Sequence, residues 1–81
     1  MNIFNHVSSI LCELSGSDMI CLHYRLIEDL SLDSLQMVTL LMMLEEEFKI
    51  VLAESDMNPF DLITVQNVVD LVERYISGKE P

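Results

Sequence analysis

Hydrophobic residues recur at three- and four-residue spacing in three stretches of the chain, and this spacing places them on one face of a helix. The three stripes are Phe4, Val7, Ile10, Leu11 and Leu14; Met37, Leu40, Leu41, Leu44 and Phe48; and Val65, Val68, Val69, Val72 and Ile76. No stretch sustains the alternation of apolar and polar residues that is typical of a half-buried strand. The pattern therefore predicts an all-α protein.

The residues that flank the stripes predict where the helices begin and end. Helices are expected over about 2–15, 34–48 and 65–77. Gly16 suits the left-handed conformation that often follows a helix. Asp33 or Ser34 can cap the second helix, because both side chains accept hydrogen bonds from the free amide groups of a first turn. Thr64 can cap the last helix in the same way.

Two connections separate these helices. The first, over 16–33, is long and rich in apolar residues, so we expect it to pack on the helices instead of extending into solvent. The second contains Asn58-Pro59, a pair that signals a turn or a helix start. A short further helix is expected there, over about 55–62. With 81 residues the chain is long enough for one domain, which we take as residues 1–81.

The charge balance narrows the choice of partners. The chain has 14 acidic residues against 4 basic ones, and its formal net charge is −10 at pH 7. Nucleic-acid binding needs clustered basic side chains that displace counterions from phosphates. The four basic residues here are scattered, so nucleic acid is excluded as a partner, and anionic membrane surfaces are disfavoured for the same reason. A basic protein surface is the natural complement.

The residues that could bind metal or form disulfides are few. His6, Cys12, Cys21 and His23 lack the paired short spacings of zinc sites, so no metal is expected. The first residues do not resemble a signal peptide. We therefore expect two free thiols in a reducing, cytoplasmic compartment. No apolar run reaches the roughly 20 residues of a membrane span.

The helix over 34–48 is more hydrophobic than one buried face requires. Leu35, Val38, Met42 and Met43 lie outside its main stripe. One interpretation is a central helix that contacts all of its neighbours. The other is a docking surface around Leu35, Val38 and Met42, since the flexible thioether of methionine adapts to varied partners. The pattern leaves both interpretations open.

No catalytic constellation is visible, but the start of this helix suits a phosphate group. Asp29, Ser31 and Asp33 begin like a calcium loop. That interpretation fails because Ser34 stands where the loop needs glycine and Leu40 where it needs glutamate. Ser34 instead places a hydroxyl beside the free amide groups and the positive dipole end of a helix. The alternative is that Ser34 only caps the helix.

Four short motifs stand in order along the chain. They are Leu26-Ile27-Glu28-Asp29-Leu30, Asp33-Ser34-Leu35, Leu44-Glu45-Glu46-Glu47-Phe48 and Ile63-Thr64-Val65-Gln66. Each motif is weak alone, and their combined spacing is specific. Together they resemble the acyl carrier protein family, small helical proteins that carry acyl chains on a phosphopantetheine arm. With the first stripe in register, the likeness covers essentially the whole chain.

The resemblance implies an antiparallel four-helix bundle with a long first loop and a short third helix. It implies that Ser34, flanked by Asp33 and Leu35, carries covalent 4′-phosphopantetheine, which a phosphopantetheinyl transferase takes from coenzyme A. The protein is then a carrier and not an enzyme, with its cargo held as a thioester. In the family the bundle can open around an acyl chain. The residues implied as lining, otherwise plain core, are Met37, Leu44, Ile63 and Val69.

Partner enzymes of the family dock basic patches against the second helix. The docking positions implied here are Gln36, Val38, Thr39, Met42, Glu45 and Glu46. Gln36 and Thr39 are neutral where general fatty-acid carriers often have acids, and each lost exposed ion pair is worth about 0.2–1 kcal/mol. We therefore expect a monomeric carrier dedicated to a polyketide, lipid or specialised fatty-acid pathway. Its expected partners are acyltransferases, acyl ligases or ketosynthases.

Two other functions remain open from the sequence. A peptidyl or aminoacyl carrier of a nonribosomal pathway would use the same serine and helix. A helical adaptor would bind partner helices through its methionine-rich face and carry no prosthetic group. Modification of Ser34 separates the adaptor from both kinds of carrier, and the identity of the loading enzyme separates the two carriers.

Overall fold

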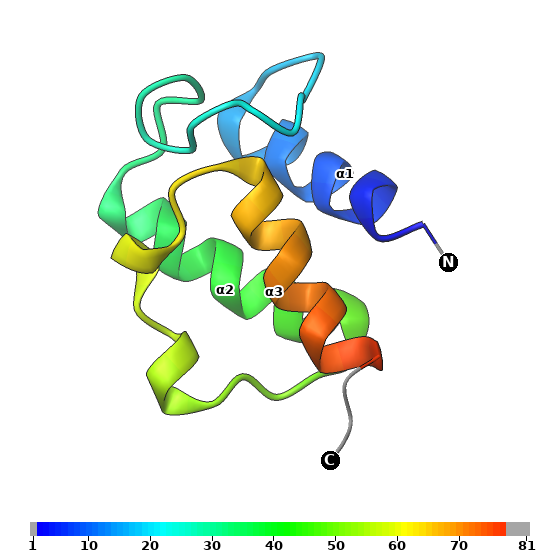
Figure 1. The fold of residues 1–81 in the computed structure, drawn as a ribbon. Coiled ribbons are helices and arrows are strands. Elements are labelled where there is room, and N and C mark those ends of the chain that lie inside the picture. Colours follow the sequence, from blue (N-terminus) through cyan, green and yellow to red (C-terminus); the bar gives the residue numbers. More distant parts are fainter. Residues whose placement is uncertain (1, 78–81) are drawn as a thin grey trace.

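The computed structural model describes residues 2–77, which form three α-helices and two 3₁₀ turns (Figure 1). In chain order they are α1 (Ile3–Ser15), α2 (Ser34–Phe48), η1 (Glu54–Asp56), η2 (Pro59–Asp61) and α3 (Val65–Ser77). No strand is present within these residues, and the predicted all-α class is confirmed. The limits of α2 and α3 coincide with those expected from their stripes, and α1 begins one residue later than expected.

Capping residues explain where α1 and α3 begin or end. Asn2 accepts a hydrogen bond from the amide group three positions on, at 3.1 Å. Gly16 follows α1 in the left-handed conformation, with φ of 77°, and its amide donates to the Cys12 carbonyl. At the start of α3, the Thr64 hydroxyl accepts from the Asn67 amide at 3.2 Å, and the Asn67 side chain accepts from the Thr64 amide at 3.0 Å. Gly16 and Thr64 thus have their expected roles.

The short helix expected over about 55–62 is replaced by two separate 3₁₀ turns. Asn58 precedes a proline, and the proline ring disfavours the helical conformation in the residue before it. The Asn58 side chain instead accepts a hydrogen bond from the Phe60 amide at 3.0 Å, and its carbonyl accepts one from the Asp61 amide at 3.1 Å. These local bonds begin η2, so the structure has two short turns where the resemblance implied a short third helix.

Contacts at both ends show that α1 and α2 run in opposite directions. At one end, His6 Nδ1 and Glu47 Oε2 lie 2.5 Å apart, and the His6 ring packs edge-on against Phe48. At the other end, Gln36 Nε2 donates to the Leu14 carbonyl at 3.0 Å. The start of each helix therefore lies beside the end of the other.

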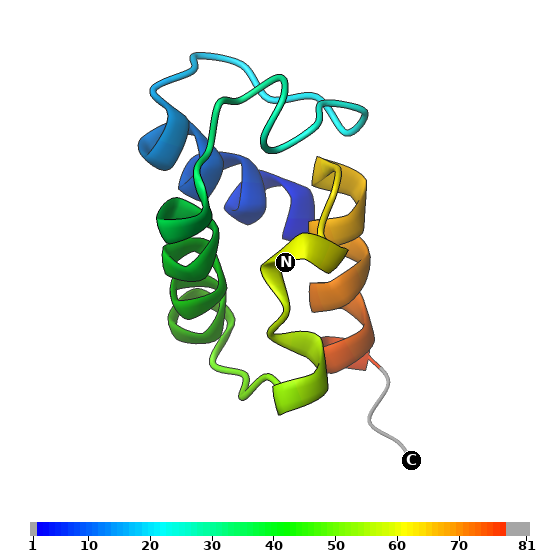
Figure 2. The same ribbon diagram turned by 90° about the vertical axis from the view of Figure 1, so that its left-hand side faces the viewer.

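Helix α3 runs in the same direction as α2 (Figures 1 and 2). Its first residue, Val65, donates its amide to the Tyr24 carbonyl in the loop that precedes α2. Near its end, the Tyr75 hydroxyl accepts from the Ala53 amide in the segment that follows α2. The implied antiparallel arrangement thus holds for α1 against the other two helices and not for the α2–α3 pair. The segment with η1 and η2 passes between α2 and α3 on one side of the bundle (Figure 2).

The inward faces of the helices and parts of both connections form one hydrophobic core. Its buried residues are Val7, Ile10, Leu11, Ile20, Leu26, Leu30, Leu32, Met37, Leu40, Leu41, Leu44, Phe48, Leu52, Leu62, Val65, Val68, Leu71 and Val72. All five residues of the α2 stripe are among them. Phe4, Leu14, Val69 and Ile76 pack at the edge of the core and are only half-buried.

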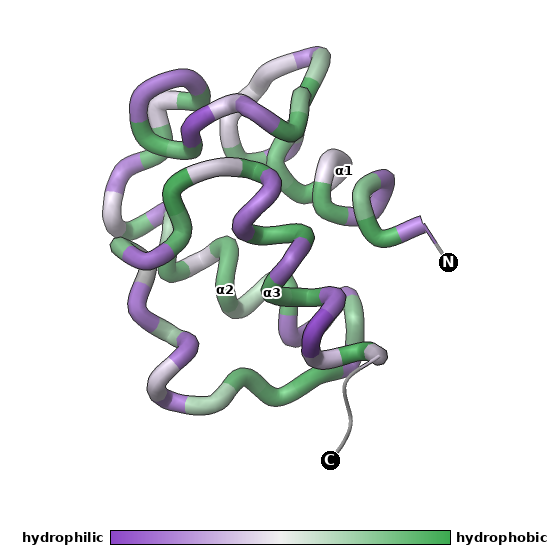
Figure 3. The backbone as a smooth tube through the Cα atoms, in the orientation of Figure 1, coloured by the Kyte–Doolittle hydropathy of each residue, from purple (hydrophilic) through white to green (hydrophobic). Residues whose placement is uncertain are grey.

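The first loop, over 16–33, packs on the helices as expected. Figure 3 shows hydrophobic residues spaced along it among polar ones, and four of them belong to the core. Backbone hydrogen bonds fix the loop further. The Leu26 amide donates to the Ile63 carbonyl at 2.9 Å, and Arg25 pairs with Thr64 in an isolated antiparallel β-bridge. The loop is therefore a fixed support that leads directly into α2.

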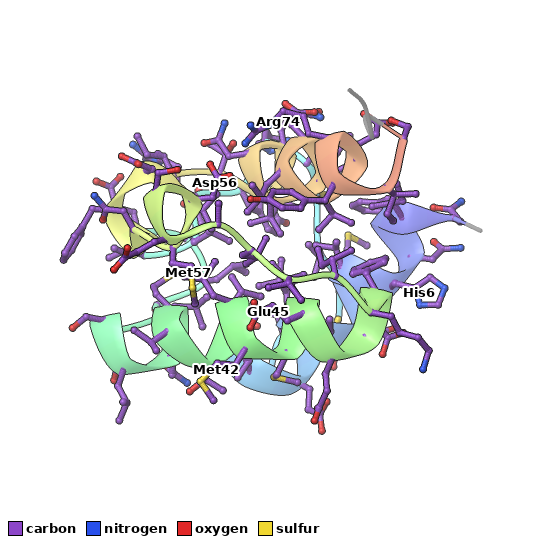
Figure 4. The ribbon with its side chains drawn as sticks, turned by 90° about the horizontal axis from the view of Figure 1, so that it is seen from below. His6, Met42, Glu45, Asp56, Met57 and Arg74 are labelled. Atoms are coloured by element: carbon purple, nitrogen blue, oxygen red, sulfur yellow. The ribbon has the colours of Figure 1, made fainter. Side chains whose placement is uncertain are left out.

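Side chains hold the second connection, in contrast to the first. Glu45 Oε2 accepts from the Leu52 amide at 2.9 Å. The Tyr75 hydroxyl donates to Asp56, which also lies 3.7 Å from Arg74 Nη2. Figure 4 shows Glu45 on the side of α2 that faces this connection, and Asp56 and Arg74 near α3. Four charged or polar side chains thus fix a segment that has little regular structure.

Candidate functional site at the start of helix α2

Asp33 caps α2, which resolves the choice that the sequence left open between Asp33 and Ser34. Its backbone is extended, with φ of −95° and ψ of 177°. Asp33 Oδ1 accepts from the Gln36 amide at 2.8 Å, and Gln36 Oε1 accepts from the Asp33 amide at 3.2 Å. This reciprocal pair is a capping box. The Ser34 hydroxyl is therefore not needed to cap the helix.

Ser34 is the first residue of α2, and it is exposed. Among the described residues its hydroxyl has no hydrogen-bond partner, nor do the backbone amides of Ser34 and Leu35. These two amides point out of the helix start, where the aligned peptide dipoles leave a partial positive charge. A free hydroxyl beside free donors fits a phosphodiester that is bonded to the hydroxyl oxygen.

The end of the first loop sets the position of Ser34. Leu30 and Leu32 are both buried, and Ser31 between them has the left-handed conformation, with φ of 60°. The Leu32 amide donates to the Leu26 carbonyl at 3.1 Å. The apolar side chain of Leu32 therefore anchors the loop in the core two residues before Ser34. The serine is held on a rigid support while its own side chain stays free.

Acidic side chains before α2 are already partnered. Arg25 Nη1 lies 2.5 Å from Glu28 Oε1, and Asp29 Oδ2 accepts from the Arg25 amide at 2.7 Å. All three side chains are exposed, so these pairs contribute little stability. They do offset negative charge in the segment that leads to Ser34. Asp33, which directly precedes Ser34, directs its carboxylate to the helix amide groups.

The outer face of α2 carries most of the predicted docking residues. Leu35, Val38 and Met42 are exposed by 76, 41 and 57%, respectively. Figure 4 shows Met42 pointing away from the bundle. Thr39 is half-buried and its hydroxyl donates to the Leu35 carbonyl at 3.1 Å, while Glu46 is exposed. The exposed apolar residues lie on one stripe because they are three and seven positions apart.

Two predicted docking residues have internal partners instead. Gln36 is half-buried, closes the capping box and donates to the Leu14 carbonyl, which ties α2 to the end of α1. Glu45 lies three positions after Met42, but it is half-buried and its carboxylate accepts from the Leu52 amide, so it is directed to the second connection. The spacing Asp-x-x-Gln was a signal in the sequence for the role of Gln36. No comparable signal marked Glu45, because its partner belongs to an irregular segment.

The residues implied as acyl lining lie in different environments. Met37 and Leu44 are buried in the core, and Val69 is half-buried at its edge. Ile63 is 59% exposed and so lines no interior, which corrects that expectation. The segment before α3 is extended, and successive side chains of an extended segment point to opposite sides. Leu62 therefore faces the core in place of Ile63.

Exposed Ile63 instead borders a surface pocket of about 170 Å³, together with Ile27 and Phe60. Phe60 and Ile27 are themselves exposed by 70 and 48%. The backbone of Ile63 is held on both sides, since its carbonyl accepts from Leu26 and its amide donates to Asn67. This apolar spot is thus a fixed feature of the surface.

The histidines and cysteines form no metal site within residues 2–77. His6 contacts Glu47 and Phe48 at the α1–α2 end of the bundle, and His23 packs edge-on against Tyr24. Cys12 and Cys21 are free and half-buried. Of these residues, His6 contacts a second helix and Cys12 packs against the core. No helix within the described part of the chain is long and apolar enough to cross a membrane.

Comparisons with known proteins match most of the chain to one family. The family model described as "Phosphopantetheine attachment site" matches residues 6–72. An acyl carrier protein of Campylobacter concisus is 34% identical over 76 residues, which cover 91% of this chain and 96% of that protein. An acyl carrier protein of Campylobacter hominis is 36% identical over 81 residues, which cover 98% of this chain and all of that protein.

A further relative, the acyl carrier protein of Campylobacter lari, is 35% identical and aligns with 90% of this chain. The family model and these relatives define a carrier domain. The chain belongs to the phosphopantetheine-attachment family, among the acyl carrier proteins. Members of this family are not enzymes, and they are modified by a phosphopantetheinyl transferase with covalent 4′-phosphopantetheine.

Proposed function

We propose that Ser34 is the attachment residue and that the chain carries acyl groups as thioesters on an arm bonded to its Oγ. The observation that supports this best is the exposed, unpartnered hydroxyl on the first residue of α2, beside the free amides of Ser34 and Leu35. In the attachment reaction, Ser34 Oγ loses its proton and bonds to phosphorus. The bond between that phosphorus and the nucleotide part of coenzyme A breaks.

The chain's own residues position this reaction and hold its product. Asp33 caps the helix, so the amides that follow it stay directed at the phosphodiester oxygens, where the helix dipole favours negative charge. Leu32 keeps the preceding loop fixed in the core. The arm, when bound, supplies a terminal thiol that forms the thioester with the cargo.

The outer face of α2 is the proposed docking surface for the transferase and the pathway enzymes. It consists of Leu35, Val38, Thr39, Met42 and Glu46, without Gln36 and Glu45, which have internal partners. Acyl chains that enter the bundle would meet Met37, Leu44 and Val69. Because a packed interior has few voids, such entry would require the helices to separate.

The pathway is the finer part of the proposal. On the docking surface the neutral side chain of Thr39 supports a monomeric carrier dedicated to a polyketide, lipid or specialised fatty-acid pathway, with acyltransferases, acyl ligases or ketosynthases as partners. Two free cysteines support a reducing, cytoplasmic location. The relatives are all named acyl carrier proteins, which favours an acyl cargo over a peptidyl one.

Intact-mass measurement tests the attachment residue. The chain is coexpressed with a phosphopantetheinyl transferase of broad specificity, as wild type, Ser34→Ala and Ser31→Ala. We expect the mass of one phosphopantetheine on the wild type and on Ser31→Ala, and none on Ser34→Ala. Ser31 is a matched control because it is an exposed serine three residues away. Equal addition to Ser34→Ala, or a bare wild type beside a modified control carrier, would refute the proposal.

A further inference from the structure

The outer face of α2 has an uneven distribution of charge. Its exposed stripe begins with Leu35, directly after Ser34, and continues through Val38 and Met42. Its one charged side chain is Glu46, which lies about 16 Å further along the helix axis than Leu35, at 1.5 Å per residue. The half of the face beside Ser34 is therefore apolar and uncharged.

The polar groups that border the apolar half of the outer face are already hydrogen-bonded within the chain. Gln36 is tied to Asp33 and Leu14, the Thr39 hydroxyl donates to the Leu35 carbonyl, and Glu45 is tied to Leu52. A partner that contacts this surface finds few free polar groups to pair with. Of the other acids of α2, Glu47 lies 2.5 Å from His6 Nδ1 and borders a cleft of about 390 Å³ against α1, away from the apolar half.

An enzyme that acts on the Ser34 hydroxyl must cover the residue beside it. Leu35 is 76% exposed and follows Ser34 on the same helical turn. Any such enzyme buries Leu35, and a footprint that extends along the helix also buries Val38 and Met42. Burial of apolar side chains is favourable without any charge on the partner.

We infer that the phosphopantetheinyl transferase recognises this chain through an apolar surface that packs on Leu35, Val38 and Met42, and not through ion pairs with α2. The inference rests on the proposed attachment at Ser34 and specifies the partner of that site. The net charge of −10 still attracts a basic enzyme from a distance. The short-range contact that determines affinity is hydrophobic.

Steady-state kinetics of arm transfer test this inference. The apo chain is the substrate, coenzyme A the donor, and a transferase of broad specificity the enzyme. The variants Leu35→Ala, Val38→Ala and Met42→Ala remove exposed apolar side chains, and Glu46→Gln removes the charge. Val51→Ala serves as the matched apolar control, because Val51 is 84% exposed and lies outside α2. Glu73→Gln, on the exposed side of α3, is the matched charge control.

We expect Leu35→Ala and Met42→Ala to raise KM about tenfold, which corresponds to about 1.4 kcal/mol. Val38→Ala is expected to raise KM less, because Val38 is the least exposed of the three. Glu46→Gln is expected to change KM less than about twofold, because the inferred contact includes no ion pair with Glu46 and exposed charges contribute little. The ratios of variant to wild-type KM should be the same in 0.05 and 0.5 M salt.

Each variant is compared with the wild type at the same salt concentration. The effect of the net charge on the rate of encounter with the enzyme then cancels in the KM ratio. The inference is overturned if Glu46→Gln raises KM more than Met42→Ala does, or if the three apolar variants behave like Val51→Ala. Circular-dichroism melting verifies that each variant is folded. A wild type that no transferase modifies refutes attachment at Ser34, and the docking inference with it. Modification that depends on Glu46 refutes only the docking inference.

Discussion

Helix α2 presents apolar side chains on two opposite faces, and the structure treats them differently. On the inner face Leu40 and Leu44 are fully buried among the other helices. On the outer face Leu35 and Met42 are exposed by 76 and 57%. Both faces carry leucine and methionine, so hydrophobicity alone does not distinguish a folding residue from a binding residue.

The difference lies in what each face has available to contact within the chain. The inner face is covered by α1, α3 and the two connections, so its side chains stabilise the fold. The outer face has no element of the described chain above it. Its apolar side chains are in contact with water, and their burial by a partner would lower the free energy. Substitutions on the inner face should therefore change stability, and substitutions on the outer face should change docking.

The largest effect is expected for the inner face. Leu44→Ala removes a fully buried side chain and leaves a cavity, which should lower the free energy of unfolding by about 2–5 kcal/mol. Urea unfolding followed by circular dichroism measures this change. Leu35→Ala provides the matched comparison, since it deletes the same atoms from the outer face. Equal losses for the two variants would contradict the distinction between the faces.

Capping of α2 is expected to have the next largest effect. Asp33→Ala removes the acceptor for the Gln36 amide, and loss of an N-cap costs about 1 kcal/mol. Ser34→Ala should leave stability nearly unchanged, because the Ser34 hydroxyl has no partner among the described residues. Thermal melting of both variants tests this contrast. A larger loss for Ser34→Ala would show that serine, and not aspartate, supports the helix.

The sequence predicted the inner face well because helical periodicity reports burial directly. All five residues of the predicted α2 stripe are buried, and Gly16 and Thr64 have their expected capping roles. Ser34 could be singled out because local motifs place a serine at a helix start. Local spacing is sufficient for such features, since they depend on residues that are near one another in the chain.

The sequence could not assign residues whose partners are distant in the chain. Gln36 and Glu45 seemed available for docking, and their partners Leu14 and Leu52 become neighbours only in the folded chain. Ile63 was expected inside, and backbone bonds from the first loop fix an extended segment that turns it outward. The division of 55–62 into two turns has a different cause, because it depends on local hydrogen bonds of Asn58 in place of a continuous helix.

The segment that follows α2 offers a test of a polar inward contact. Tyr75→Phe removes the hydroxyl that donates to Asp56 and accepts from Ala53, which should cost about 1 kcal/mol at neutral pH. The hydrogen bond to Asp56, with some burial, raises the pKa of Tyr75 above its ordinary value of about 10. The contribution of Tyr75 is therefore complete below pH 10.

Above pH 10 the unfolded chain ionises at Tyr75 before the folded chain does, so this contribution falls as the pH rises through the raised pKa. The difference in unfolding free energy between wild type and Tyr75→Phe should accordingly shrink from pH 9 to pH 11. Urea unfolding at each pH measures it. Tyr24, whose pKa is also raised by the Cys21 thiol, is present in both proteins and cancels. A difference that grows with pH would contradict this account.

The smallest effect on stability is expected on the outer face, where it separates the two roles of α2 most clearly. Met42→Ala should change the free energy of unfolding by less than about 0.5 kcal/mol, because the side chain is mostly in water already. The same variant is expected to raise KM for arm transfer, whereas Leu44→Ala should mainly lower the free energy of unfolding. The free energy of unfolding and KM are therefore measured for both variants. We expect each variant to change mainly one of the two quantities, which a general loss of structure or of hydrophobicity could not produce. A large loss of stability in Met42→Ala would mean that the outer face is part of the core.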